Sequence, residues 1–270
     1  MNMSKQFDIL VIDDEQVVVD AVIKICTAEG YKVDSAFDAS EALKKFRTEN
    51  YRIILCDIMM PEIDGFQLLN EVIKRNIESP LIMTTGFSTV ENAVKSLYNG
   101  AIDFVPKPFT SDELLSSVIR GLRYSDIQKR LKPADMNTDD SSIAYVPCPA
   151  KYSRLGYSSW AFQDLSGSVL IGITDLFLRT IEAVDEIELH KRDDEVIQGN
   201  SCAQIKSKKE IIHSILSPVS GRILERNEKV LNETSIIEKD PYFEGWLYRV
   251  IPSDMEYELK QLIPCSSDRL

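Results

Sequence analysis

The sequence is poor in the residues from which metal and disulfide sites are built. Its 270 residues include two histidines, His190 and His213, and five cysteines. The cysteines are scattered, odd in number and never spaced as Cys-x-x-Cys, which indicates reduced thiols rather than a disulfide framework or a zinc site. The low histidine count also excludes a histidine-rich metal site.

Long apolar runs and an excess of positive charge are missing as well. No stretch reaches the roughly 20 apolar residues that a membrane helix needs, and residues 1–7 lack the apolar segment of a signal peptide. Residues 1–130 hold 15 Lys and Arg against 20 Asp and Glu, and residues 131–270 hold 16 against 23, so the halves carry −5 and −7. We therefore expect a cytoplasmic protein that spans no membrane and binds no nucleic acid.

The first half of the chain alternates short apolar segments with amphipathic ones. Strands are expected near 7–12, 31–36, 51–56, 80–84 and 102–105, and helices near 15–29, 38–49, 65–75, 88–99 and 110–131. Ser88 and Thr110 are suitable N-caps for the last two helices. Five strands and five helices in alternation predict a doubly wound α/β domain with a five-stranded parallel sheet.

The second half has a different pattern. Residues 132–150 are polar, with proline near both ends, and predict a linker. Beyond them, strands are expected near 158–163, 168–174, 186–190, 202–206, 219–225 and 246–251, with a closing helix near 256–263. We therefore divide the chain into residues 1–131, 132–150 and 151–270, and predict that the last part is an all-β sandwich or flattened barrel.

Charged side chains follow three of the expected strands in the first half. Asp13 and Asp14 follow the first strand, Asp57 ends the third, and Lys107 follows the fifth. The carboxyl ends of parallel strands meet at one edge, where open α/β sheets place their ligand sites. Three acids and one lysine at that edge indicate a divalent cation together with a phosphoryl group.

Residues 5–125 resemble the receiver domain of a two-component response regulator. The motifs that carry the resemblance are Asp13-Asp14, Asp57 with Met60-Pro61 and Asp64-Gly65, Thr84-Thr85-Gly86, and Phe104-Val105-Pro106-Lys107-Pro108-Phe109. The resemblance implies a flavodoxin-like fold. It also implies that Asp57 takes a phosphoryl group from a phosphohistidine on a sensor histidine kinase or phosphotransfer protein. Such a protein catalyses its own phosphoryl transfer and dephosphorylation and is not an enzyme in the usual sense.

The resemblance to receivers implies a role for each charged residue. Asp13, Asp14, Asp57 and the backbone carbonyl of Met59 would hold Mg²⁺, which prefers a few carboxylates and phosphate oxygens. Lys107 would pair with the oxygens of the incoming phosphoryl group.

The resemblance further implies a conformational switch. Thr85 would be the hydroxyl that bonds a phosphoryl oxygen, and Phe104 the aromatic residue that repacks when Thr85 moves. Thr84 is the alternative switch residue, although strand alternation points it to the other face. A receiver of this kind also pairs into homodimers, here through residues near 88–99 and 110–123.

The second half resembles the H-protein of the glycine cleavage system, a lipoyl carrier. The matching residues are Gly172-Ile173-Thr174-Asp175, Asp194-Glu195-Val196 with Gly199, Ser217-Pro218-Val219-Ser220-Gly221, Asn227, Asp240-Pro241-Tyr242 with Glu244-Gly245-Trp246-Leu247, and Pro252-Ser253-Asp254. The resemblance covers residues 151–263 and implies a lipoyl-type β sandwich. Trp160 and Trp246 are expected in its core, and His213 at its surface.

The position of the carrier lysine is ambiguous. Counting forward from Asp175 places it at Lys209, whereas counting back from Pro218 places it at Glu210, so the hairpin holds an inserted residue. The family acid three positions earlier is Lys206 here. Two hypotheses follow: a protein-interaction output domain with an unknown protein partner, or a carrier with lipoate on Lys209. A DNA-binding output is disfavoured, because no helix-turn-helix pattern is present and both halves are acidic.

Overall fold

The structure is a computed structural model that describes residues 6–87, 89–131 and 145–269. The chain divides into two compact units, one formed by residues up to 88 with 99–129, and the other by 89–98 with the residues from 130 onward. Most of the predicted linker and the predicted N-cap Ser88 lie outside the described residues.

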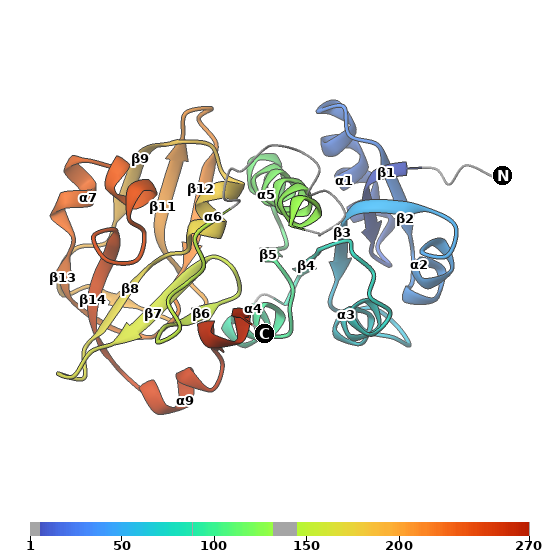
Figure 1. Ribbon diagram of the computed structural model, residues 1–270. Coiled ribbons are helices and arrows are strands. Elements are labelled where there is room, and N and C mark those ends of the chain that lie inside the picture. Colours follow the sequence, from blue (N-terminus) through green and yellow to red (C-terminus); the bar gives the residue numbers. More distant parts are fainter. Residues whose placement is uncertain (1–5, 88, 132–144, 270) are drawn as a thin grey trace. The chain divides into compact units, whose positions relative to one another are not determined.

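The N-terminal strands form one parallel sheet in the order β2-β1-β3-β4-β5 (Figure 1). The strands are β1 (Gln6–Ile12), β2 (Val33–Ala36), β3 (Asn50–Asp57), β4 (Leu81–Thr85) and β5 (Asp103–Pro106). The helices are α1 (Gln16–Ala28), α2 (Ala39–Lys45), α3 (Gly65–Lys74), α4 (Val90–Tyr98) and α5 (Ser111–Arg130). This strand order is that of flavodoxin-like folds, so the predicted fold class is confirmed. Within the described residues, α2 ends four residues before its expected end at 49.

Both faces of the sheet are buried. Successive strand residues point to opposite faces, so each strand contributes to two apolar clusters. Ile9, Val11, Ile53 and Leu55 face one cluster, which also contains apolar residues of α1 and α5. The alternate strand residues face a second cluster, which contains residues of α2 and α3; they are Leu10, Ile12, Ile54, Cys56, Leu81 and Met83. Burial on both faces explains why these strands read as continuous apolar runs.

The C-terminal region contains two antiparallel sheets. The larger has the order β10-β13-β14-β8-β7-β6-β15 and the smaller the order β12-β11-β9. The strands are β6 (Ser153–Leu155), β7 (Ser159–Gln163), β8 (Val169–Ile173), β9 (Val184–Leu189), β10 (Glu195–Val196), β11 (Ser201–Ser207), β12 (Ile212–Leu216), β13 (Gly221–Arg226), β14 (Trp246–Pro252) and β15 (Ile263–Pro264). The predicted all-β domain is confirmed.

Across the residues that the structure describes, no helix is long and apolar enough to cross a membrane.

Short helices connect several of these strands. They are α6 (Asp175–Thr180), α7 (Glu228–Asn232), α8 (Ser235–Lys239), α9 (Met255–Leu259) and a final 3₁₀ helix, Cys265–Arg269. The closing helix expected at 256–263 is therefore shorter than predicted and is followed by β15. Helices α6, α7 and α8 were not predicted, because five or six residues are too few for a helical period to be recognised.

The prediction that His213 lies at the surface is wrong. His213 belongs to β12 and pairs with Ile205 of β11, and its exposed fraction is 1%. Residues paired across a sheet point to the same face, so His213 faces inward with Ile205, which belongs to the apolar core. The segment after Lys209 was expected to belong to the hairpin tip, so β12 was not predicted.

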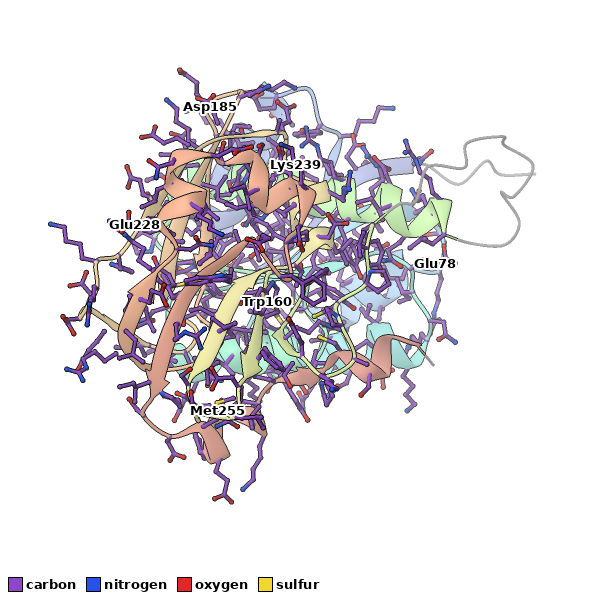
Figure 2. The ribbon with its side chains drawn as sticks, turned by 60° about the vertical axis from the view of Figure 1, so that its left-hand side comes forward. Glu78, Trp160, Asp185, Glu228, Lys239 and Met255 are labelled. Atoms are coloured by element: carbon purple, nitrogen blue, oxygen red, sulfur yellow. The ribbon has the colours of Figure 1, made fainter. Side chains whose placement is uncertain are left out.

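Two aromatic residues anchor the C-terminal domain. Trp160 of β7 is fully buried (Figure 2), and its indole N–H lies 3.0 Å from the carbonyl oxygen of Ile173 and 3.1 Å from that of Pro241. Tyr248 of β14 donates its hydroxyl to the carbonyl of Cys202 in β11 at 2.7 Å, so it ties the larger sheet to the smaller one. Trp246 is partly buried and packs in the same aromatic cluster as Trp160.

Candidate functional site

Three strands bring charged side chains to the carboxyl edge of the parallel sheet. Ile12 of β1 pairs with Cys56 of β3, so Asp13 and Asp57 follow adjacent positions on neighbouring strands. Lys107 follows β5, and its backbone N–H donates to the carbonyl of Thr85 at the end of β4 at 2.8 Å. The predicted convergence of these residues therefore has a direct cause in the strand register.

Lys107 bridges the two buried carboxylates. Its Nζ lies 2.6 Å from Oδ2 of Asp13 and 2.7 Å from Oδ1 of Asp57, and 3.8 Å from the exposed carboxylate of Glu15. The side chains of Lys107, Asp13 and Asp57 are 10%, 1% and 4% exposed. A buried ammonium shared by two carboxylates leaves one negative charge in excess at this edge.

Burial and charge pairing act together on the ionisation of this cluster. Burial raises the pKa of Asp13, and the hydrogen bond and charge of Lys107 only partly oppose that shift. Burial lowers the pKa of Lys107, but its hydrogen bonds and charge pairs with Asp13 and Asp57 outweigh burial, so its pKa is raised. Lys107 therefore remains a cation throughout the physiological pH range.

The loop after β3 folds back over Asp57. The second carboxylate oxygen of Asp57 accepts a hydrogen bond from the backbone N–H of Met59 at 2.7 Å. The N–H of Gly65 donates to the carbonyl of Ile58 at 2.9 Å. A Cβ at Gly65 would lie 2.3 Å from the Asp57 carbonyl oxygen, so only glycine permits this close approach.

Within the described residues, neither predicted switch residue makes a hydrogen bond to the bridged acids. Thr85 is fully buried, and its hydroxyl accepts a hydrogen bond from the N–H of Phe87 at 3.1 Å. Phe104 of β5 is partly buried against the apolar cluster that contains Met83. The structure thus places both residues on strands that neighbour the site, β4 and β5, but does not test the predicted switch.

The donor set suits a divalent cation, although the acids are not gathered as a metal cluster. The carboxylate of Asp14 is exposed and makes no hydrogen bond or ion pair within the described part of the chain. No group of three His, Cys, Asp or Glu side chains is close enough to hold a metal ion in that part. Asp13 and Asp57 already present their carboxylate oxygens to a cation, the Lys107 ammonium, and carboxylate oxygens are ligands that Mg²⁺ prefers.

The predicted carrier lysine lies in the turn between β11 and β12. The N–H of Glu210 donates to the carbonyl of Ser207 at 2.8 Å, and Glu210 has a φ of 62°. A type I turn followed by a left-handed residue is common in three-residue hairpin loops. Lys209 is 69% exposed, but its Nζ lies 2.5 Å from Oε1 of Glu182. The neighbouring Lys208 is exposed and has no ion pair among the described residues.

Sequence reasoning missed two partners of the predicted site residues. The backbone N–H of Met59 donates to the Asp57 carboxylate, and the role predicted for the Met59 carbonyl stays a prediction. Glu182, which pairs with Lys209, precedes β9 and is 27 positions away from it in the sequence. No motif marks Glu182, because the pairing of β9 with β11 brings the two residues together.

Two family profiles match separate parts of the chain. The profile of the response regulator receiver domain family matches residues 9–119, and that of the glycine cleavage H-protein family matches residues 151–267. The transcriptional regulatory protein DltR of Streptococcus agalactiae is 34% identical over 150 residues, which cover 54% of this chain and 67% of DltR. ZraR of Klebsiella oxytoca, also a transcriptional regulatory protein, is 33% identical over 125 residues, which cover 46% of this chain and 28% of ZraR.

Solved structures resemble each half separately. A response regulator receiver domain protein from Methanospirillum hungatei is 32% identical and covers 46% of this chain and 99% of its own, with a TM-score of 0.43. A glycine cleavage system H protein from Mycobacterium marinum is 26% identical and covers 44% of this chain and 94% of its own, with a TM-score of 0.40. Because of the profile matches and the identity to DltR, the chain belongs to the two-component response regulator family and carries an H-protein-like domain after its receiver domain.

Proposed function

We propose that Asp57 accepts a phosphoryl group from a phosphohistidine on a sensor histidine kinase or phosphotransfer protein. The observation that carries the proposal is the Lys107 ammonium held between Asp13 and Asp57 at the sheet edge. In the transfer, the phosphorus–nitrogen bond breaks, a bond forms from phosphorus to a carboxylate oxygen of Asp57, and the histidine becomes neutral imidazole after proton exchange. Such a reaction depends mainly on positioning and charge neutralisation.

The residues around Asp57 provide that neutralisation. Lys107 would exchange its contact with the Asp57 carboxylate for the oxygens of the phosphoryl group. Asp13, Asp14, Asp57 and the carbonyl of Met59 would hold Mg²⁺, which supplies further positive charge when bound. Two of these acids, Asp13 and Asp57, are buried and already hold the Lys107 ammonium, whereas Asp14 is exposed.

Thr85 and Phe104 would be the residues that change conformation when Asp57 is phosphorylated. The Thr85 hydroxyl is held by its bond with the N–H of Phe87. After phosphorylation it would donate to a phosphoryl oxygen and pull its loop toward Asp57. Phe104 would then repack against the neighbouring apolar cluster. A homodimer formed through residues near 88–99 and 110–123 would be a second consequence of this repacking.

The H-protein-like domain is proposed as an output that binds a protein. Both halves of the chain are acidic, and acidic surfaces repel nucleic acid. Phosphorylation at Asp57 would therefore change the affinity of the chain for a protein partner rather than for DNA.

Labelling with acetyl phosphate and Mg²⁺ tests the acceptor assignment. The wild-type chain is expected to gain one phosphoryl group, and Asp57→Asn to gain none. Asp20→Asn, which removes an exposed acid of α1, is the matched control and should label normally. EDTA should abolish labelling. Persistent labelling of Asp57→Asn would refute the assignment.

A second candidate function is a lipoyl carrier modified on Lys209. It is favoured by the exposed lysines at the tip of the β11–β12 hairpin, in a region that matches the H-protein family. Co-expression with lipoylation enzymes, followed by intact mass and a peptide map, tests it. A lipoyl mass that disappears in Lys209→Arg but not in Lys208→Arg would support the carrier. An unmodified chain, beside a modified true H-protein, would leave the protein-binding output as the function.

A further inference from the structure

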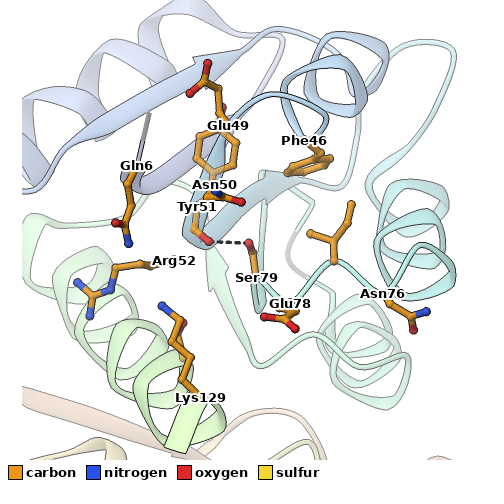
Figure 3. Close-up of a pocket in the computed structure, with 12 residues that line it drawn as sticks. Gln6, Phe46, Glu49, Asn50, Tyr51, Arg52, Asn76, Glu78, Ser79 and Lys129 are labelled. Carbon is orange, nitrogen blue, oxygen red and sulfur yellow. Dashed lines mark hydrogen bonds between the residues drawn. The ribbon is translucent and has the colours of Figure 1, made fainter. Parts of the chain in front are cut away.

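The receiver domain has a pocket at the edge of its sheet that does not carry Asp57 (Figure 3). The pocket is lined by the first residues of β1 and β3, the loop between α3 and β4, and the end of α5. Two acids and two basic residues are part of the lining, namely Glu49, Glu78, Arg52 and Lys129. Because these charges balance, the lining does not select a charged ligand. A surface that indicates a partner lies instead in the second compact unit.

Helix α4 packs against the C-terminal β domain. Residues 89–98 belong to the same compact unit as the residues from 130 onward. Val94 and Leu97, each 2% exposed, belong to the apolar core cluster of that unit, and Val90 packs against the cluster. The three residues are spaced i, i+4 and i+7, so they form one stripe along the helix. This spacing is typical of an amphipathic helix that a protein surface recognises by its apolar face.

Two glycines lie against this stripe, Gly156 between β6 and β7 and Gly199 between β10 and β11. A Cβ at Gly199 would lie 2.8 Å from Cγ2 of Val94 and 3.3 Å from Cγ1 of Val90. A Cβ at Gly156 would lie 3.1 Å from Cβ of Leu97. The lack of a side chain at both positions therefore lets the helix approach the backbone of the two turns closely.

Hydrogen bonds within the β domain hold the two turns in place. The N–H of Gly199 donates to the carbonyl of Ser217, and the N–H of Ser217 donates to the carbonyl of Asn200, both at 2.8 Å. At the start of β7, the Ser159 hydroxyl donates to the carbonyl of Leu216 at 2.7 Å. Both turns are thus attached to the end of β12 by bonds that do not involve α4.

We propose that the surface formed by the turns at Gly156 and Gly199 is where the H-protein-like domain binds its protein partner, and that α4 occupies this surface in the structure. The partner would place a helix with valine, isoleucine or leucine at positions i, i+4 and i+7 against the two glycines. This inference rests on the proposed protein-binding output and names the surface that would perform it. Since α4 and the partner helix would use the same surface, each would weaken the binding of the other.

A fluorescein-labelled peptide of residues 86–100, which contains α4, tests the proposal with the full-length chain. Fluorescence anisotropy should show that the Val94→Asp chain binds the peptide at least about tenfold more tightly than the wild-type chain. A carboxylate is unfavourable on an apolar surface, so α4 of this variant would leave the surface open. Leu97→Ala should strengthen binding to a smaller extent, and it keeps the test valid where Val94→Asp does not fold. Bound peptide should slow hydrogen exchange at residues 154–157 and 197–200.

Glu91→Gln is the matched control, because Glu91 is an exposed residue of the same helix. This variant should bind the peptide as weakly as the wild-type chain does, and a peptide that carries Val94→Asp should bind none of the chains. Equal affinity of the wild-type, Val94→Asp and Leu97→Ala chains for the peptide would overturn the proposal. An equal effect of Glu91→Gln, or protection only outside the two turns, would overturn it as well.

Two further outcomes separate this proposal from its alternatives. Self-association of the wild-type chain that Val94→Asp abolishes, measured by light scattering, would overturn the proposal in favour of a second copy of the chain as the occupant. Labelling of Asp57 by acetyl phosphate is measured without the peptide. Normal labelling without peptide binding would therefore overturn this inference alone, whereas peptide binding without labelling would refute the acceptor assignment alone.

Discussion

Replacing Lys107 with methionine would leave two buried carboxylates at the sheet edge without their cation. The Lys107 ammonium lies 2.6 Å from Asp13 and 2.7 Å from Asp57, and all three side chains are almost excluded from solvent. Removal of one partner from a buried ion pair costs about 3–5 kcal/mol. We therefore expect Lys107→Met to reduce the free energy of unfolding of the receiver domain by about that amount.

Asp57→Asn provides the contrasting perturbation. It removes one of the two carboxylates and leaves the Lys107–Asp13 pair in place, so the cluster becomes neutral. We expect its unfolding free energy to change by about 1 kcal/mol or less in either direction. Lys107→Met combined with Asp57→Asn should recover part of the stability lost in Lys107→Met, because only one bare carboxylate remains.

The assay must report on the receiver domain alone. Both tryptophans, Trp160 and Trp246, lie in the C-terminal domain, so tryptophan fluorescence does not follow unfolding of the receiver. Peptide-resolved hydrogen exchange of β1 and β3 in the full-length chain does. A loss of 3–5 kcal/mol corresponds to exchange about 150 to 5,000 times faster. An effect of Lys107→Met no larger than that of Asp57→Asn would refute the reasoning.

Three further predictions concern the C-terminal domain. Hydrogen bonds from two neighbouring serines, with the charge of Arg249, lower the pKa of Asp164 to about 2. The ionised Asp164 therefore contributes to the stability of the fold above about pH 4, and this contribution is lost as the pH falls toward 2. A midpoint near pH 4 for the Asp164 carboxyl in ¹³C NMR would contradict this prediction. A Cβ at Gly172 would lie 2.5 Å from the ring of Trp160, so Gly172→Ala should cost about 1–3 kcal/mol, measured by tryptophan fluorescence in urea. Burial raises the pKa of Cys202 to about 12, so iodoacetamide at pH 8 should label this thiol in urea but not in the folded protein.

Much of the receiver could be predicted because its signals are local. Each strand is a short apolar run bounded by turn residues, and the alternation of strands and helices leaves few topologies. Asp13, Asp57 and Lys107 lie at the carboxyl ends of the first, third and fifth strands, and the carboxyl ends of parallel strands share one edge.

The C-terminal domain was predicted less completely because its elements are short and its contacts are long-range. The helices α6, α7 and α8 span five or six residues each, too few to establish a helical period, and the strand β12 was expected to be part of the hairpin tip. The wrong placement of His213 followed from the missed strand. Its burial depends on its pairing with Ile205.

The sequence by itself determined the fold classes and the set of acids with one lysine, because these depend on local periodicity and on strand order. Only the tertiary structure decided how those groups are paired. It placed Lys107 between two buried carboxylates and brought Glu182 to Lys209. These pairings join residues on different strands and loops, and their distances depend on packing and burial that no local pattern in the chain encodes.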